Sequence, residues 1–333
     1  MTNSNSSSIP TMGAILEADE QGAVVTALKT ALELDVFEIV ARGPQSVEEI
    51  ARAARCSVRG MSVLLDALCV KGLLDKNNGN YLLTPTSETY LVRNGRGYCV
   101  PIYLAWLQAR EKFIDFVRTG KATLDLTSPQ AEEIWASYAA PDRIRLPELV
   151  EVVTKRWTNS GILSRMKPGA HILDLGCGSG FKSFSLLKLD PSARVTGVDS
   201  PKVLEISEEI ARLMGVASRV TLQTGDVDRE LPANTYDMVI IGSLLHYFDA
   251  PSATDILRSA HRALKENGII VIYAKAADEE RKTDPSLLSM IDVSNCAPFA
   301  RHYTYSEYKT ILENAGFRDV TQTEIVIISA VKS

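Results

Sequence analysis

Hydrophobic positions change their spacing about halfway along the chain. Before residue 155 apolar residues recur at helical spacing, and beyond it short apolar runs typical of buried strands alternate with helical segments. Strands that alternate with helices of this length imply parallel crossovers. The sequence therefore predicts a mostly helical N-terminal domain over residues 11–155 and an α/β domain with a Rossmann-like, doubly wound sheet over residues 156–333. Residues 1–10 are polar and are expected to form a disordered tail.

The first half of the chain carries the local signals of a winged helix. A helix is expected over residues 26–43, ending at Gly43. Ser46 and Glu49 then form a capping-box pattern before a second helix, and a third follows over residues 56–74. Asn78–Gly79 next predicts a turn between two short strands. The order of helix, helix and β-wing is that of a winged helix-turn-helix.

A winged helix is best known as a DNA-binding unit, but its charge here is weak. Residues 42–76 contain six basic and four acidic side chains. Phosphate contacts supply most nonspecific affinity for DNA, so this thin excess favours a packing module. A DNA-binding regulator is the alternative.

The second half of the chain alternates strands with helices. The expected strands cover residues 171–176, 194–200, 219–226, 236–246 and 269–276, and the helices between them cover 181–190, 200–215 and 252–268. A last helix and two strands are expected to close the sheet with a hairpin at its edge.

The composition of the chain disfavours several classes of binding partner. The net charge of −5 offers no global attraction to nucleic acid or to anionic membranes. No apolar run reaches the length of about 18 residues that suggests a membrane span. The five cysteines are scattered, with no CxxC pair for zinc or redox chemistry. A cytoplasmic protein without a metal, a membrane or a nucleic-acid partner is expected.

A glycine loop follows the first strand of the predicted sheet. Gly176, Gly178 and Gly180 alternate in the segment DLGCGSG, where they allow a tight turn close to a ligand. Ligands of doubly wound sheets bind beyond the carboxyl ends of the strands, which is where this loop lies. The GxGxG pattern alone is weak evidence, and its third glycine comes one residue too early for the dinucleotide pattern.

Two acidic residues follow the next two strands. Asp199 is placed to accept hydrogen bonds from a ribose diol, and Asp226 to accept one from an adenine amino group. Two acids at successive strand ends suit one nucleoside. The alternatives are that Asp199 caps the following helix and that Asp226 is a simple turn residue.

Residues 171–272 resemble the class I S-adenosylmethionine-dependent methyltransferases, through HILDLGCGSG, GVDS, TGDV and YDMVIIGSLLHYFD. The N-terminal half, FVRTGKATLD and YTYSEYKTILENAGF look like the small-molecule O-methyltransferases of plant caffeic-acid type and bacterial polyketide-tailoring type. The resemblance implies an intertwined homodimer formed by the N-terminal domain, a small aromatic or polyketide-like acceptor, and S-adenosylmethionine as cofactor. The cofactor-binding residues that it implies are Asp174, Gly176, Gly178, Gly180, Asp199, Ser200, Asp226, Val227, Gly242, Ser243 and Phe248.

His246 is the expected catalytic residue. It follows a buried strand at the ligand end of the sheet, and by resemblance it takes the place of the family's general base. The plant enzymes hold this base with two acidic neighbours, where this chain has Ala274–Lys275 and His302. The missing acids leave O-methylation in competition with methylation of carbon or nitrogen, and with a protein that binds the cofactor for other chemistry.

His302 is a possible second active-site group, either paired with His246 around a substrate or, less favourably, a metal ligand. Several aromatic residues are expected to be core or to line a pocket for a flat substrate. They are Tyr103, Trp106, Tyr138, Tyr247 and Tyr303.

Overall fold

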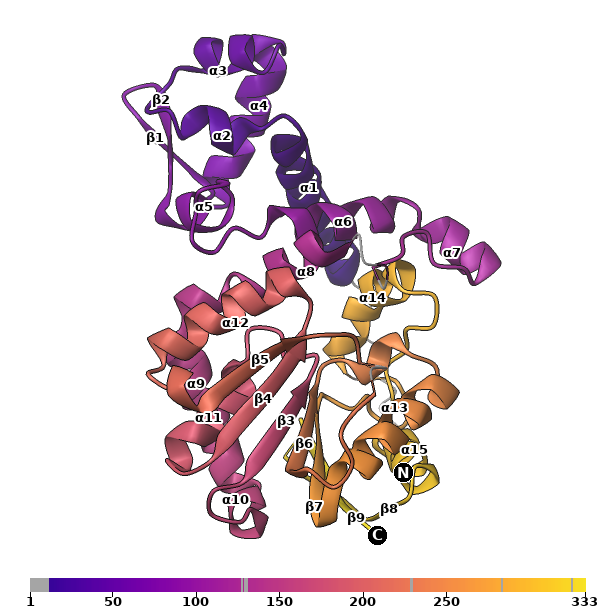
Figure 1. Cartoon of the computed structure of the whole chain (residues 1–333). Coiled ribbons are helices and arrows are strands. Elements are labelled where there is room, and N and C mark those ends of the chain that lie inside the picture. Colours follow the sequence, from indigo (N-terminus) through magenta and orange to yellow (C-terminus); the bar gives the residue numbers. More distant parts are fainter. Residues whose placement is uncertain (1–11, 127, 129–130, 228–229, 283, 325) are drawn as a thin grey trace, which may run out of the picture. The chain divides into compact units, whose positions relative to one another are not determined.

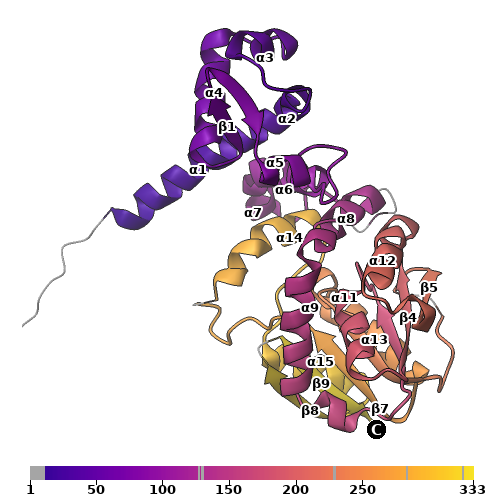
Figure 2. The ribbon, with the colours of Figure 1, turned by 90° about the vertical axis from the view of Figure 1, so that its left-hand side faces the viewer.

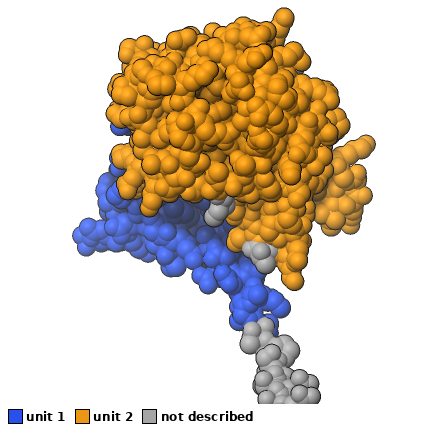
Figure 3. Space-filling view, turned by 90° about the horizontal axis from the view of Figure 1, so that it is seen from below, with its two compact units in different colours: residues 1–100 blue, residues 101–333 orange. Residues whose placement is uncertain are grey.

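The protein is described by a computed structural model over residues 12–126, 128, 131–227, 230–282, 284–324 and 326–333, so the expected tail over residues 1–10 lies outside the described part. The chain divides into two compact units, residues 1–100 and 101–333, which have different colours in Figure 3. Within the described ranges, no helix is long and apolar enough to cross a membrane.

Unit 1 has the element order of the predicted winged helix (Figure 1). Its elements are α1 (Gly13–Glu33), α2 (Val36–Val40), α3 (Val47–Ala53), α4 (Val58–Val70), β1 (Leu74–Asn77), β2 (Asn80–Leu83) and α5 (Pro85–Tyr90). The capping box of Ser46 and Glu49 is confirmed. One continuous helix over residues 26–43 was a wrong prediction, because Asp35 adopts a left-handed conformation with φ 52° and separates α1 from α2.

Unit 2 begins with helices and continues with the sheet. Its helical part contains α6 (Val100–Glu111), whose first residue ends unit 1, then α7 (Phe113–Thr119), α8 (Glu132–Ala139), α9 (Asp142–Asn159) and α10 (Ile162–Arg165). Residues 101–155, which the sequence groups with the N-terminal domain, thus belong to the same compact unit as the sheet. That the chain changes its role near residue 155, from dimerisation and substrate contacts to cofactor binding, stays a prediction.

The sheet of unit 2 is the predicted Rossmann-like sheet. Along the chain come β3 (His171–Leu175), α11 (Phe181–Leu189), β4 (Arg194–Asp199), α12 (Pro201–Leu213), η2 (Ala217–Arg219), β5 (Val220–Thr224), β6 (Tyr236–Gly242), η3 (Leu245–Tyr247), α13 (Ala250–Ala263), β7 (Leu264–Tyr273), η4 (Pro285–Ser289), α14 (Met290–Cys296), α15 (Tyr305–Asn314), β8 (Phe317–Glu324) and β9 (Ile327–Lys332). The strand order is β5-β4-β3-β6-β7-β9-β8. The first five strands are parallel, while β9 runs antiparallel to β7 and β8. The expected hairpin at the sheet edge is confirmed.

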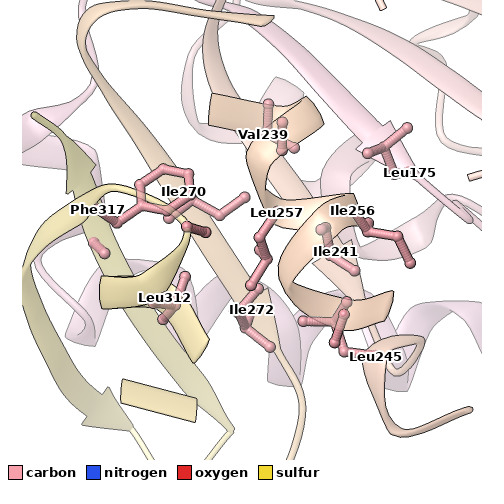
Figure 4. Close-up of a cluster of buried hydrophobic side chains, with 14 of the residues drawn as sticks. Leu175, Val239, Ile241, Leu245, Ile256, Leu257, Ile270, Ile272, Leu312 and Phe317 are labelled. Atoms are coloured by element: carbon pink, nitrogen blue, oxygen red, sulfur yellow. The ribbon is translucent and has the colours of Figure 1, made fainter. Parts of the chain in front are cut away.

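Alternate residues of the central strands point to opposite faces of the sheet, so each face has its own apolar core. One core packs against α13 and α15, and Figure 4 shows part of it. Its members from the central strands are Leu173, Leu175, Val239, Ile241, Ile270 and Ile272. The other core contains the intervening residues of the same strands and packs against α9, α10, α11 and α12, several of which lie in front of the sheet in Figure 2.

Several element boundaries differ from the sequence prediction, and two of them lie in the second half of the sheet. The strand expected over residues 236–246 ends at Gly242, and His246 instead lies in the short 3-10 helix η3. The helix expected up to Gly268 ends at Ala263, because Leu264 already pairs with Tyr236 of the neighbouring strand. Tertiary pairing overrides helix propensity at this point.

Candidate functional site

The glycine loop after β3 has backbone angles that other residues rarely adopt. Gly176, Gly178 and Gly180 have φ values of 65°, 58° and 78°. The amide of Gly176 donates a hydrogen bond of 2.9 Å to the carbonyl of Val198, which ties the loop to β4. A Cβ on Gly180 would lie 2.3 Å from the ring of Phe184. The turn therefore requires glycine at all three positions because of the backbone angles. At Gly180 it also requires glycine because a side chain would have no space.

Asp199 lies at the carboxyl end of β4, beside the glycine loop. Its Oδ2 accepts a hydrogen bond of 2.8 Å from the Gly178 amide, and its Oδ1 accepts one of 2.8 Å from the Ser200 amide. Burial raises the pKa of the Asp199 carboxyl, and these two bonds oppose the shift. The N-cap of α12 is Ser200, so the alternative that Asp199 caps the helix is wrong.

Asp226 lies near Asp199. The strands β4 and β5 are parallel neighbours, with Asp199 opposite Thr224. The charge of Asp226 contributes to the raised pKa of Asp199. Asp226 also accepts a hydrogen bond of 2.7 Å from the amide of Val227, which suits a turn residue as well as a binding residue. The two acids thus meet at one edge of the sheet, as expected from sequence.

Asp174 and the end of β6 complete the expected cofactor side. Burial raises the pKa of Asp174 to about 6. Gly242 is the last residue of β6, and Ser243 after it has a left-handed φ of 53°. Such a conformation is unusual for a side-chain-bearing residue and marks a place where the fold imposes a constraint. The Ser243 amide is tied by a hydrogen bond of 3.0 Å to the carbonyl of Tyr273.

His246 and His302 come together although they are far apart in sequence. Their ring centroids lie 6.4 Å apart in an edge-to-face arrangement. The amide of Arg301 donates a hydrogen bond of 2.7 Å to the carbonyl of His246, which fixes the two segments side by side. Burial lowers the pKa of His246 to about 4, with smaller contributions from the charges of His302 and Lys182. His246 is therefore a neutral imidazole at neutral pH.

In the described part of the chain, no hydrogen bond joins a carboxylate to the ring of His246 or of His302. The Nδ1 of His302 is buried and has no hydrogen-bond partner among the described residues. Lys275 forms an ion pair with Asp284, a largely buried carboxylate that the sequence analysis did not single out. The charge of Asp284 acts to raise the pKa of His302, but burial dominates and lowers it.

A row of aromatic side chains leads to His246. Successive ring centroids along this row, which we call the aromatic row, are 4.3 to 6.1 Å apart. The row consists of Tyr103 and Trp106 from α6, Tyr138 and Trp135 from α8, and then Tyr247 and His246 from η3. Tyr103 and Tyr138 are 43% and 54% exposed, so the row is not simply core.

Two of the expected aromatic residues have other contacts. Tyr303 is 1% exposed, and its hydroxyl donates a hydrogen bond of 2.7 Å to the carbonyl of Phe248. This placement fits the packed-aromatic alternative for Tyr303. Phe248 itself is half-buried against the core that contains Tyr303.

Two side chains of this region were missed by the sequence analysis as site residues. Trp135 joins the two halves of the aromatic row, and Lys182 lies close enough to Asp174 and His246 to act on the pKa of each. The sequence did contain a signal for Lys182, because this lysine comes two positions after Gly180, the last glycine of the loop. No group of three metal-binding side chains is found in the described part of the chain.

Comparison with known proteins gives two family matches. A methyltransferase domain matches residues 166–316, and an O-methyltransferase dimerisation domain matches residues 21–93. The tetracenomycin polyketide synthesis 8-O-methyl transferase TcmO of Streptomyces glaucescens is 27% identical, over 90% of this chain and 89% of that protein. The N,N-dimethyltransferase OxyT of Streptomyces rimosus is 24% identical, over 90% of this chain and 88% of that protein. The solved structure of human N-acetylserotonin methyltransferase with SAM has the same fold, with a TM-score of 0.68, 21% identity and 99% of each chain covered.

The environment of His246 can be tested by titration. In NMR spectra of histidine-labelled protein, we expect the His246 resonance to titrate with a midpoint at about pH 4, because burial disfavours the charged ring. His302→Gln should raise this midpoint, since it removes a second positive charge, whereas His261→Gln should leave it in place. A midpoint near the ordinary histidine value of about 6.5 would contradict the buried placement.

Proposed function

This chain belongs to the S-adenosylmethionine-dependent methyltransferases that carry an O-methyltransferase dimerisation domain, and from this we propose that it methylates an oxygen of a small, flat aromatic or polyketide-like acceptor. The observation that carries the proposal is the aromatic row, which ends at a neutral, buried histidine beside the expected cofactor residues. TcmO, by its name a polyketide methyltransferase, supports this class of acceptor.

The residues at the strand ends fit the cofactor. The Asp199 carboxylate is fixed at the end of β4 by two backbone amides, with lone pairs left to accept from a ribose diol. A side chain on Gly178 would meet no atom within 4 Å, so the loop leaves its backbone open toward a ligand. When bound, S-adenosylmethionine supplies an electrophilic methyl group and leaves as S-adenosylhomocysteine. We propose that the residues implied by the resemblance, from Asp174 to Phe248, hold it.

His246 would take the proton from the acceptor hydroxyl as the oxygen is methylated. Its low pKa means that the ring is unprotonated at neutral pH and ready to receive a proton. The same low pKa makes it a weak base for a phenol, because burial disfavours the charged ring. His302 would lie on the other side of the acceptor group as a second polar contact.

The weakness of this base favours N-methylation as the second candidate. A neutral amine attacks with its own lone pair and needs less help from a base, and OxyT is by its name an N,N-dimethyltransferase. We keep methyl transfer to oxygen as the first candidate because the dimerisation-domain family is one of O-methyltransferases.

We also propose that the protein is a homodimer formed through unit 1. Helix α1 presents exposed apolar side chains, among them Ile15 at 65% and Leu16 at 60% exposure. An apolar hollow lies between α1 and α4, lined by Val24, Ala27 and Leu68. Exposed apolar surfaces of this kind commonly mark protein contacts, and the dimerisation domain matches residues 21–93, which include Val24, Ala27 and Leu68 of the hollow.

Cofactor binding tests the first proposal. S-adenosylhomocysteine at millimolar concentration should raise the melting temperature of the wild-type protein, because it binds only the folded state. Asp199→Ala should abolish this shift, since the ribose would lose its acceptor. Asp255→Ala, at an exposed carboxylate on α13, is the control and should keep the shift. An unchanged wild-type melting curve would overturn the proposal.

The role of His246 is tested by His246→Gln. With a phenolic acceptor we expect methyl transfer to fall by roughly 10²–10⁴-fold, the usual contribution of a general base, while the cofactor-induced melting shift remains. With an amine acceptor the loss should be much smaller. Because the pKa of His246 is lowered, the wild-type rate should decline with acid only near pH 4 to 5 rather than near 6.5. Equal rates for His246→Gln and wild type on every acceptor would exclude the proton-accepting role.

The oligomeric state is tested by sedimentation. Wild-type protein should sediment at twice the chain mass of 36.4 kDa. Leu16→Asp should shift it toward the monomer, because a charge would be buried in the interface. Leu213→Asp, at an exposed leucine of α12, is the matched control. A monomeric wild-type protein would contradict the dimer.

A further inference from the structure

Lys182 is a charged residue of the sheet's ligand end that the proposed mechanism leaves unused. It is the second residue of α11, two positions after Gly180. Its carbonyl accepts a hydrogen bond of 2.9 Å from the indole of Trp157, which fixes its backbone. Its Nζ lies 5.3 Å from the ring centroid of Phe181 and 5.8 Å from that of Tyr273. The ammonium is thus held between aromatic rings instead of extending into solvent.

The same ammonium lies against the end of β6. A Cβ added to Gly242 would lie 3.3 Å from Cδ and 3.5 Å from Nζ of Lys182. This contact places the charge between the ends of β6 and β3, at the point where the glycine loop begins. The absence of a side chain at Gly242 leaves the lysine room to lie there.

Lys182 has no ion-pair partner within the described part of the chain. Burial lowers its pKa, and the charges of Asp174 and Asp142 oppose the shift without either carboxylate forming a close pair. Asp142 instead accepts a hydrogen bond of 2.6 Å from the Ser179 hydroxyl. A partly buried ammonium is costly unless it is paired, so this arrangement is suited to an anion that the protein itself does not supply.

The neighbouring charges indicate which anion fits. An ammonium beside two carboxylates is complementary to a zwitterion, whose own ammonium would face Asp174 and whose carboxylate would face Lys182. The methionine part of S-adenosylmethionine has these two groups. We propose that Lys182 binds the α-carboxylate of the cofactor and positions its amino-acid end. This inference rests on the proposed function and goes beyond it by assigning a role to Lys182.

Lys182→Met tests the role because it keeps the length of the side chain and removes the charge. By calorimetry, we expect the Kd of S-adenosylhomocysteine to rise roughly tenfold or more, as for loss of a charge-assisted hydrogen bond. The Kd of 5′-methylthioadenosine, which shares the nucleoside and the thioether but lacks the carboxylate, should stay within about twofold. The melting temperature without ligand should be unchanged or higher, since the variant buries no unpaired charge.

Two further variants sharpen the test. Lys182→Arg should retain part of the affinity for S-adenosylhomocysteine, because it keeps the positive charge. Lys188→Met, on the exposed side of the same helix, should change neither Kd.

Three results would overturn the assignment. The first is equal affinity of wild type and Lys182→Met for S-adenosylhomocysteine. The second is an equal loss for both ligands, which would indicate general damage to the site. The third is unchanged binding with a raised pKa of His246, which would place the role of Lys182 at the histidine. If wild-type protein bound neither ligand, the proposed function itself would fail and this assignment with it.

Discussion

The hydrogen bond between the Gly178 amide and the Asp199 carboxylate is the interaction on which the site depends. It exists because β3 and β4 are parallel neighbours in a register that brings the glycine loop beside the end of β4. The loop is able to make this approach only because its glycines adopt left-handed backbone angles. A shift of register by one residue would turn the side chains of β4 to the opposite face and separate the carboxylate from the loop.

Several ionisable side chains of the site are buried. Burial raises the pKa of Asp174, Asp199 and Asp142 and lowers that of His246 and Lys182. Each shift records a cost of keeping an ionisable group away from water in the unliganded protein. Clusters of such groups are typical of ligand sites, where the partner offsets that cost. The cluster spans both the expected cofactor side and His246, so the proposed cofactor binding and the proposed proton transfer would share one electrostatic environment.

The proposed acceptor side is built differently, from aromatic rings. Two helices outside the sheet, α6 and α8, supply most of the aromatic row, and η3 supplies its last members. Edge-to-face contacts between the rings stabilise their arrangement independently of any ligand. The bidentate ion pair of Arg110 and the buried Asp292 also ties α6 to α14. Helix α6, one of the two helices that would recognise an acceptor, is therefore tied to the segment that leads to His302.

Local pattern was enough to predict the alternation of strands and helices, the glycine loop, and the meeting of Asp199 and Asp226. These features depend on short-range periodicity and on one rule, that parallel strands end at the same edge of the sheet. The sequence also located His246 near that edge, but it extended the strand through it, because an apolar run continues past Gly242. Only the tertiary structure brought His302 to His246, joined Trp135 to Tyr247, and enclosed Lys182 between Phe181, Tyr273 and Gly242. Apart from Phe181, which precedes Lys182 directly, those neighbours come from segments distant in the chain, and their contacts are decided by how side chains fill the space between packed elements, which no local spacing encodes.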